Sequence, residues 1–589
     1  MLESNPNDGI IIMTPTTRQS HDEVQVWQQQ EQQQQRKQRK QQEQHTQQPN
    51  YHIVFSTGCD QQQEWESYVF FYHAMRVQQR GNVTRIASGC SGPLQKHIKH
   101  NHQTYIHNQM SQNFHIHFTP DYSYYNGKNK RKRKRKRRDE PYKYMNKPHG
   151  LYHWMTNVLG MKLPEEEEEE EEGGGGGVNN STTTTTPPPP PLPTTSSSSS
   201  SSSSLRYSQY DDDIIILMDP DMILLRPIGH DFTNDDDRTI YTVHPDLQRI
   251  LEKKKRRKHR PPPRLSKYVT HNKLIAQHDG YLTSEWMKFN ISYITTTDDG
   301  GKKLPQYLKL LVDGENYWNA GPPYMGTARD MFRITTLWKE YVPRIYEEYP
   351  KLFAEMYGYI IASTQLLQIP TTTTATTTTT SQQQQQQQQP QPQRQIQSQQ
   401  SLPPRISHTL IKSLVVSTTK AIDREGWKFI DDNTNLPNSQ VCNTSLIFDS
   451  YKKHRSNDND SNNNIKLPIV LHYCGRYLLG DKWFFSKYRL KKQFISCETP
   501  LLTYPPLDSA TRYDYWIRPP PDAGYSHEYE TENITKIQAK REAFMICGLI
   551  HSMNEAAKYY KSHHCNNNAT TVNWNETYDF HSDPNSTRR

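Results

Sequence analysis

The sequence predicts an α/β fold built on one largely parallel sheet, and two stretches carry this prediction. The apolar run Ile214–Met218 is rich in isoleucine and bounded by polar residues, which is typical of a short strand buried on both faces. Residues 51–87 hold a short apolar run, then apolar residues at helical spacing, then a second short apolar run. This order indicates a β-α-β unit, and such units favour parallel strands.

The β-α-β unit is expected to comprise a strand over His52–Gly58, a helix over Glu64–Gln79 and a strand over Asn82–Ala87. Small residues follow each strand, and together with Arg85 they could cradle a nucleotide. The alternative is a plain strand-to-loop turn with a surface arginine. A second helix is predicted over Tyr144–Leu159, because the segment Asn146-Lys147-Pro148 is a favourable helix start.

The later ordered segments are predicted to form two helices and one short strand. Apolar spacing predicts helices over Ala328–Tyr341 and Lys540–Tyr560. The short run Ile469-Val470-Leu471 predicts a strand that ends at His472. Glu355 stands inside the otherwise apolar segment Leu352–Ala362, where a carboxylate must find a partner or a ligand. A structural salt bridge and a contact with substrate are the two alternatives.

The composition indicates one domain that long polar tracts interrupt. Only 32% of the 589 residues are hydrophobic, and each ordered piece is too short to close a core by itself. We therefore expect a single domain with disordered insertions and basic loops. The expected parts are a disordered Gln-rich tail (1–50), the domain (51–505) with disordered insertions (about 163–208 and 366–405) and basic loops (128–138 and 253–264), and a C-terminal extension (506–589) with one helix and a disordered tail.

The cysteines and histidines suggest no zinc or redox site. The seven cysteines contain no C-x-x-C pair, and their odd number allows disulfides together with one free thiol. His97, His100 and His102 lie in a setting rich in Lys, Gln and Asn, which favours a solvated helix face over a metal site. No apolar run is long enough to predict a membrane span, and the first residues are too polar for a signal peptide.

Asp219-Pro220-Asp221 directly follows the buried strand that ends at Met218. The carboxyl ends of strands are where open α/β sheets bind their ligands. Two carboxylates one residue apart suit Mg²⁺ or Mn²⁺, which in turn can hold a diphosphate. This is the logic of the D-x-D motif of nucleotide-sugar glycosyltransferases, and an acidic turn after a strand is the alternative interpretation.

His472 could supply a third ligand to the same ion, because it also stands at a strand end. Imidazole is acceptable to Mn²⁺ and poor for Mg²⁺, so this ligand would favour manganese. If one ion is shared, the His472 imidazole must lie within about 5 Å of the Asp221 carboxylate. Lys482 and Lys487 follow in the sequence and could neutralise a diphosphate, although each alone is more often a surface cation.

Several blocks of the sequence, in order, resemble the family of hydroxyproline O-arabinosyltransferases and peptidyl-serine α-galactosyltransferases. The blocks are HIVFSTGCDQQQEW with GNVTRI, MNKPHGLYHWM, IIILMDPDMILLRPI, EMYGYIIA and LHYCGRYLLGDKWFFSKY. The resemblance implies a single GT-A-like (Rossmann-like) mixed sheet flanked by helices. It also implies a UDP-sugar donor, a divalent cation (Mn²⁺, or Mg²⁺) and a protein or peptide acceptor that carries a hydroxyl. Galactose or arabinofuranose would pass to Ser or hydroxyproline with retention of configuration.

The resemblance also assigns roles to individual residues. Asp219 and Asp221 match the D-x-D carboxylates of the family, and His472 matches its late histidine. Asn146 and Lys147 match its N-K-P block. Glu355 matches its E-M-Y block, where it would position the acceptor or stabilise an oxocarbenium-like state. The expected donor-binding residues are Arg85, Asn146, Lys147, Asp219, Lys482 and Lys487. The segment Tyr473–Arg476 departs from the pattern of both groups of enzymes.

The resemblance implies an enzyme of the Golgi or ER lumen, and sequons such as those at Asn82 and Asn290 agree with a glycoprotein. Enzymes of the family carry a signal or anchor that the sequence from Met1 does not show, so membrane association is expected only if an anchor lies upstream. The alternative is a nuclear, nucleic-acid-binding, low-complexity protein, which the basic runs and Gln tracts would support. No zinc-finger, homeodomain or RNP motif is present, so nucleic acid is not expected as a partner.

Overall fold

A computed structural model describes a large part of the chain, which divides into two compact units, residues 1–50 and 51–589. All the elements below belong to the second unit. The expected Gln-rich tail, the basic loops and nearly all of both insertions lie outside the described residues. The described residues are 49–124, 141–163, 208–232, 240–243, 268–278, 282, 288–295, 319–366, 407–411, 415–416, 441–443, 468–474, 476–479, 483–506, 516–517, 532–533, 536–565 and 577–578.

An 8-stranded mixed sheet forms the centre of the fold. The first four strands in its spatial order run parallel to one another, β8 is antiparallel to both of its neighbours, and β6 is antiparallel to β9. The α/β class with a mixed sheet flanked by helices is thus confirmed. In spatial order the strands are β3 (Phe114–Thr119), β2 (Asn82–Ser88), β1 (Tyr51–Thr57), β4 (Ile214–Met218), β8 (Ala320–Thr327), β7 (Lys273–His278), β9 (Ser407–Ile411) and β6 (Ile240–Val243).

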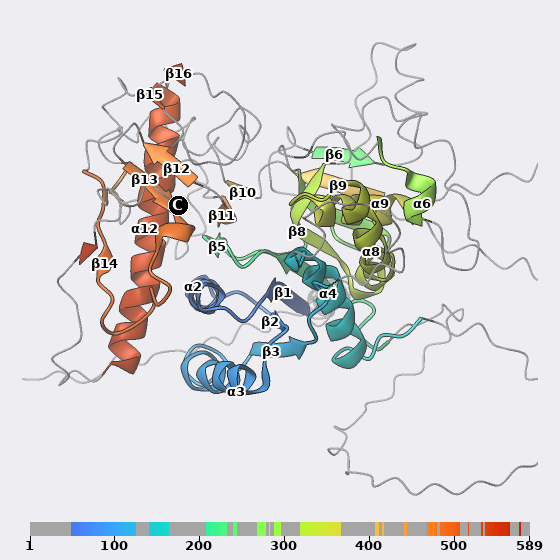
Figure 1. The fold of residues 1–589 in the computed structure, drawn as a ribbon, viewed down its shortest axis with the longest axis horizontal. Coiled ribbons are helices and arrows are strands. Elements are labelled where there is room, and N and C mark those ends of the chain that lie inside the picture. Colours follow the sequence, from blue (N-terminus) through green and yellow to red (C-terminus); the bar gives the residue numbers. More distant parts are fainter. Residues whose placement is uncertain are drawn as a thin grey trace, which may run out of the picture. The chain divides into compact units, whose positions relative to one another are not determined.

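Strand β4 shows why both faces of this sheet are apolar. Alternate residues of a strand point to opposite faces, and all of β4 is buried. Ile215 and Leu217 pack in a core with α4 (Asn146–Asn157), α8 (Ala328–Glu348) and α9 (Ala354–Gln365), whereas Ile216 packs on the other face with α2 (Gln61–Arg76). Figure 1 shows α4, α8 and α9 on one side of the sheet and α2 on the other.

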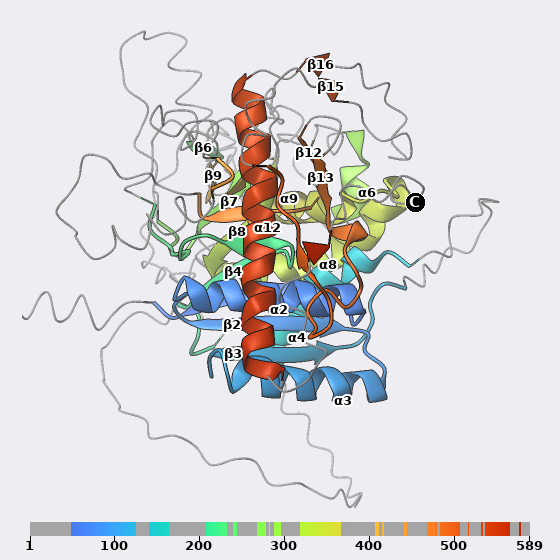
Figure 2. The ribbon, with the colours of Figure 1, turned by 90° about the vertical axis from the view of Figure 1, so that its left-hand side faces the viewer.

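The long helix α12 (Lys536–His564) adds a further layer outside α2 (Figure 2). Its buried face shares one apolar core with Trp65 and Val69 of α2. Two disulfides, Cys442–Cys547 and Cys497–Cys565, attach this helix and the residue after it to earlier segments. A third disulfide joins Cys59 to Cys90, and Cys474 is a free thiol. The odd number of cysteines is thus explained by three disulfides and one thiol.

A small second sheet lies beside the main one and has the order β10 (Val415–Val416), β11 (Val470–His472) and β5 (Met222–Leu224). Strand β5 follows β4 after a short turn, and it pairs antiparallel with β11 so that His472 stands opposite Met222. Segments far apart in the sequence therefore meet immediately after β4. The remaining strands pair as β12 (Arg476–Leu479) with β13 (Trp483–Ser486), β14 (Leu501–Leu502) with β17 (Thr577–Tyr578), and β15 (Trp516–Ile517) with β16 (Glu532–Asn533).

The short helical elements complete the described fold. They are α3 (Gly92–Asn101), η1 (His102–His107), η2 (Lys143–Met145), α6 (Ile291–Thr295) and η8 (Lys487–Arg489). The expectation of a solvated histidine face holds for His97 and His100, which are exposed. It is wrong for His102, which is buried and whose Nε2 lies 3.2 Å from the carbonyl oxygen of Phe114. Among the described helices, none combines the length and the apolar character that crossing a membrane requires.

Several helix boundaries differ from the expected ones for local reasons. Helix α2 begins at Gln61 rather than Glu64, because the Asp60 carboxylate accepts a hydrogen bond from the Gln63 N–H and caps the first turn. Helix α8 continues beyond Tyr341 to Glu348 and contains Pro343. Its buried residues extend to Ile345, so apolar packing outweighs the usual helix-breaking effect of proline.

Candidate metal and substrate site

The candidate site lies at the carboxyl ends of β1 and β4, which are neighbours in the sheet. Strands β2 and β3 lie on one side of β1, whereas the next strand in sequence, β4, lies on its other side. The strand order thus reverses between β1 and β4, and such reversals leave a crevice in which open α/β sheets bind ligands. Strand β4 ends at Met218, so Asp219 and Asp221 emerge at this crevice.

Asp219, Asp221 and His472 each offer a ligand atom, and these atoms all lie within 4.8 Å of one another. The pairing of β5 with β11 produces this arrangement. The backbone N–H of Tyr473 donates to the carbonyl oxygen of Asp221 over 3.0 Å, which places His472 beside the turn. His472 Nε2 is 3.3 Å from Asp221 Oδ1, within the separation expected of ligands that share one ion.

The chemistry of these three groups fits a divalent cation. His472 Nε2 is buried and has no hydrogen-bond partner among the described residues, although the Asp221 carboxylate is close. Burial by itself would lower the pKa of His472, but the nearby Cys474 and Asp221 outweigh it and raise the pKa well above the usual range. A cation at this position would displace the imidazole proton and give the buried nitrogen a partner.

Each carboxylate of the acidic pair is also bound to a buried lysine. Lys147 Nζ lies 2.7 Å from Asp219 Oδ1, and Lys487 Nζ lies 2.7 Å from Asp221 Oδ2. Burial alone would lower the pKa of both lysines, but the facing carboxylates outweigh it and raise the pKa of both. In the same way the pKa of Asp221 is lowered, because Lys487 and His472 outweigh the effect of burial. Asp221 and Lys487 therefore face each other as opposite charges.

Each lysine contacts a second, deeply buried carboxylate. Glu355 Oε2 lies 3.3 Å from Lys147 Nζ, and Glu66 Oε1 lies 3.6 Å from Lys487 Nζ. Glu355 and Glu66 are only 2% and 1% exposed. Burial raises the pKa of both to about 7, although the neighbouring lysine acts in the opposite direction. Glu66 was not expected from the sequence. Its only signal was an acidic residue between the apolar Trp65 and Tyr68 of α2.

Glu355 has a fixed backbone and an unused carboxylate oxygen. Its backbone N–H donates to the Tyr142 hydroxyl over 3.0 Å, and its carbonyl oxygen accepts from Trp338 Nε1 over 2.8 Å. Oε1 is buried and has no hydrogen-bond partner among the described residues. Of the two alternatives left open by the sequence, the structure shows the salt bridge, with Lys147, whereas a contact with substrate stays a prediction.

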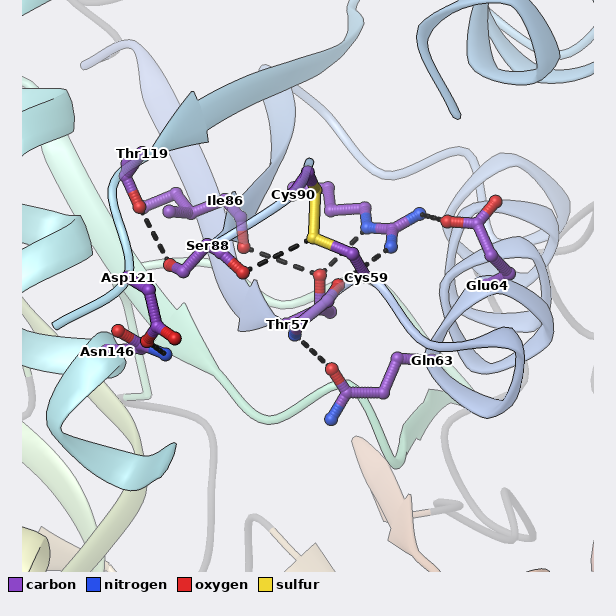
Figure 3. The surroundings of a disulfide bond; sticks show 12 residues. Thr57, Cys59, Gln63, Glu64, Ile86, Ser88, Cys90, Thr119, Asp121 and Asn146 are labelled. Carbon is purple, nitrogen blue, oxygen red and sulfur yellow. Dashed lines mark hydrogen bonds and ion pairs between the residues drawn. A yellow bond between two sulfur atoms is a disulfide. The ribbon is translucent and has the colours of Figure 1, made fainter. Parts of the chain in front are cut away.

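Arg85 does not join this cluster by any described contact. It is 2% exposed rather than a surface arginine, and it braces the loop after β1. Its Nε donates to Thr57 Oγ1 over 2.8 Å, and Nη1 lies 2.6 Å from Glu64 Oε1. The Cys59–Cys90 disulfide ties this loop to the loop after β2 (Figure 3). These contacts give Arg85 a structural role near the carboxyl ends of the strands.

Asn146 likewise holds a loop instead of facing the acidic pair. Its Oδ1 accepts from the Tyr122 N–H over 2.7 Å, and its Nδ2 donates to Asp121 Oδ1 over 3.1 Å. Asn146 therefore fastens the loop after β3 to the start of α4, next to Lys147 (Figure 3). Lys482 lies outside the described residues. Of the residues expected from the sequence, the structure brings together Lys147, Asp219, Asp221, Glu355, His472 and Lys487.

Comparisons with known proteins place the chain in no family. No family model matches it, and no curated protein matches it in sequence. Among solved structures it is similar to WbbM, a bifunctional glycosyltransferase in its apo form, with 9% identity and a TM-score of 0.22. The similarity covers 53% of this chain and 37% of the length of that structure. A likeness this weak carries no argument about function.

The raised pKa of Glu355 makes a prediction about stability. The pKa of Glu355 is raised to about 7 in the folded state, whereas an exposed glutamate has a pKa of 4.5. The proton on Glu355 therefore stabilises the folded state fully below pH 4.5. This stabilisation is lost as the pH rises from 4.5 through 7. Glu355→Gln does not titrate, so its stability relative to the native chain should rise by about 2–3 kcal/mol between pH 5 and pH 8.

Urea unfolding of both proteins in chelator-treated buffer at the two pH values measures this difference. Removing free cations matters, because an ion bound beside Lys147 would change the charges around Glu355. A stability difference that is the same at pH 5 and at pH 8 would show that Glu355 has an ordinary pKa.

Proposed function

We propose that this protein is a metal-dependent glycosyltransferase that moves a sugar from a UDP donor to a hydroxyl of a protein. The observation that carries the proposal is the convergence of Asp219, Asp221 and His472 beside the carboxyl end of β4. Two oxygen ligands with one imidazole nitrogen suit Mn²⁺ better than Mg²⁺. A partly buried cluster of this composition, at the reversal of strand order, supports the binding of a diphosphate.

Asp219, Asp221 and His472 would hold the cation, which when bound would neutralise charge on the diphosphate as the glycosidic bond breaks. Lys147 and Lys487 now balance the two aspartates. If a cation engaged the aspartates, Lys147 and Lys487 could exchange these contacts for contacts with phosphate oxygens. Because each lysine contacts a different aspartate, the two ammonium groups would hold the leaving group at two points.

Glu355 would act on the acceptor side of the reaction. In retaining transfer from the front face, the acceptor oxygen bonds to the anomeric carbon while the bond from that carbon to the diphosphate breaks. The bonding electrons stay on the phosphate oxygen, which takes the proton of the acceptor hydroxyl. No strong protein base is then needed. The unpaired Oε1 of Glu355 would instead accept a hydrogen bond that positions the acceptor, or stabilise positive charge on the sugar.

The finer assignments rest on the sequence blocks that resemble the arabinosyl- and galactosyltransferases. They suggest galactose or arabinofuranose as the sugar, Ser or hydroxyproline as the acceptor, and retention of configuration. Lys147, Asp219, Asp221, Glu355 and His472 stand in those blocks and also meet in the structure. That agreement between sequence pattern and spatial arrangement supports a shared site, and the choice of sugar and acceptor rests on the sequence blocks alone.

The disulfides favour the lumen of the Golgi or ER as the location of this enzyme. Three disulfides use all the cysteines except Cys474, and disulfides are rare in the cytosol and nucleus. This pairing counts against the alternative of a nuclear nucleic-acid-binding protein. The basic runs that suggested the alternative, 128–138 and 253–264, lie outside the described residues.

The shared site predicts how Mn²⁺ changes stability. A ligand that binds the folded state raises the free energy of unfolding, by about 2.7 kcal/mol at a concentration 100 times Kd. Asp221→Asn and His472→Ala should each lose most of this stabilisation. The double variant should lose less than the sum of both, because the two residues serve one ion. Thermal unfolding with and without Mn²⁺ measures these effects, and strictly additive losses would indicate two separate roles.

The proposed reaction is tested directly with purified protein, Mn²⁺ and a pool of peptides that contain Ser or hydroxyproline. UDP-galactose and UDP-arabinofuranose are offered separately, and peptide masses report the transfer. We expect one added sugar residue per modified hydroxyl, with at least 100-fold less product from Asp221→Asn, because lost charge stabilisation at a reacting centre costs this much. Absence of transfer from every UDP-sugar offered would refute the proposal.

A further inference from the structure

Two tyrosines with exposed rings stand beside the two lysines of the site. Tyr144 is 44% exposed and Tyr488 is 63% exposed, although large apolar side chains are usually covered in this fold. Tyr144 lies in η2, one helical turn before Lys147. Tyr488 directly follows Lys487, whose Nζ is 5.4 Å from the centre of the Tyr488 ring. Each lysine bound to the acidic pair therefore has an exposed aromatic ring next to it.

The two tyrosines approach the same centre from different parts of the chain. Tyr144 lies in η2 and Tyr488 in η8. The rings of Tyr142 and Tyr144 are 5.5 Å apart, centre to centre. Tyr142 also accepts the hydrogen bond from the Glu355 N–H.

We propose that Tyr144 and Tyr488 form the binding rim for the acceptor, a polypeptide segment that presents its hydroxyl to the centre. This inference rests on the proposed function and extends it to acceptor recognition. The donor diphosphate would need the deep groups, since Asp221, Lys147 and Lys487 are each less than 10% exposed. The two rings are exposed whereas these groups are buried, so the rings can meet a second substrate that comes from solvent.

Tyrosine is suited to this task because it offers a large, rigid, amphipathic surface at a small entropic cost. A ring that is open to solvent in the free protein gains most when a partner covers it, and such aromatic side chains dominate the energy of many interfaces. The hydroxyls next to Lys147 and Lys487 can also bond the backbone of the acceptor segment. The rim would therefore combine apolar contact with hydrogen bonds.

The test compares Tyr144→Ala and Tyr488→Ala with the native protein in the transfer reaction, using the peptide pool and the better of the two donors. We expect each change to raise KM for the peptide by about tenfold. The KM for the donor and the stabilisation by Mn²⁺ should stay unchanged, which shows that the deep site is intact. Tyr144→Phe and Tyr488→Phe keep the rings and should retain most of the affinity for the peptide.

Tyr268→Ala is the matched control. Tyr268 is 42% exposed and forms a bridge with Asp231, next to His230, which contacts the first residue of β1. It therefore lies near the amino-terminal ends of the strands, away from the site, and its removal should not change KM for the peptide. The rise in KM for the peptide in the rim variants, compared with that in Tyr268→Ala, measures acceptor recognition.

Two results would overturn the rim while leaving the proposed function intact. One is an unchanged KM for the peptide in both alanine variants. The other is a raised KM for the donor with an unchanged KM for the peptide, which would assign the rings to the donor sugar. If the native protein binds UDP and Mn²⁺ but transfers to no peptide, the proposed function fails, and the acceptor rim fails with it.

Discussion

The pairing of β5 with β11 is the interaction on which the candidate site depends. Strand β5 begins one residue after Asp221, and its register with β11 sets His472 opposite Met222. Side chains alternate between the two faces of a strand, so a slip of one residue would turn His472 away from the carboxylates. The buried residues Ile223 and Leu471 stand opposite each other and share an apolar core, which fixes the register. The apolar packing of Ile223 against Leu471 thus places His472 beside the carboxylates of the acidic pair.

The charged groups beside this pairing form two parallel series, in which a buried glutamate contacts a lysine and the lysine contacts one of the aspartates. Desolvating so many ions is costly, and buried ion pairs often add little net stability. Removing one member would nevertheless leave its partner buried without compensation. A buried group of charges that adds little stability is characteristic of functional sites. Here it keeps two ammonium groups and two carboxylates aligned at the crevice, ready to exchange their mutual contacts for contacts with a ligand.

Local patterns in the sequence predicted the parts of this site that depend on neighbouring residues. The run before Asp219 was enough to predict β4, and the β-α-β unit was enough to predict parallel strands. The sequence alone does not show which side chains from separate elements meet. The contacts of Glu66 with Lys487 and of Arg85 with Glu64 could therefore not be predicted. Asn146 was assigned to the donor, although it fastens the loop after β3. The pairing of the cysteines could not be derived, because spacing alone does not determine which of them meet.

Whether one ion joins the acidic pair to His472 is most directly tested by pulsed electron paramagnetic resonance of Mn²⁺ bound to the protein. Imidazole coordination couples the electron spin to a directly bound nitrogen. We predict such a coupling in the native protein, its loss in His472→Ala, and its retention when the exposed His97 is changed to Ala. Bound Mn²⁺ without nitrogen coupling, or a coupling that persists in His472→Ala, would contradict a shared site. Either result would remove His472 from the metal site and leave Asp219 and Asp221 as the remaining candidate ligands.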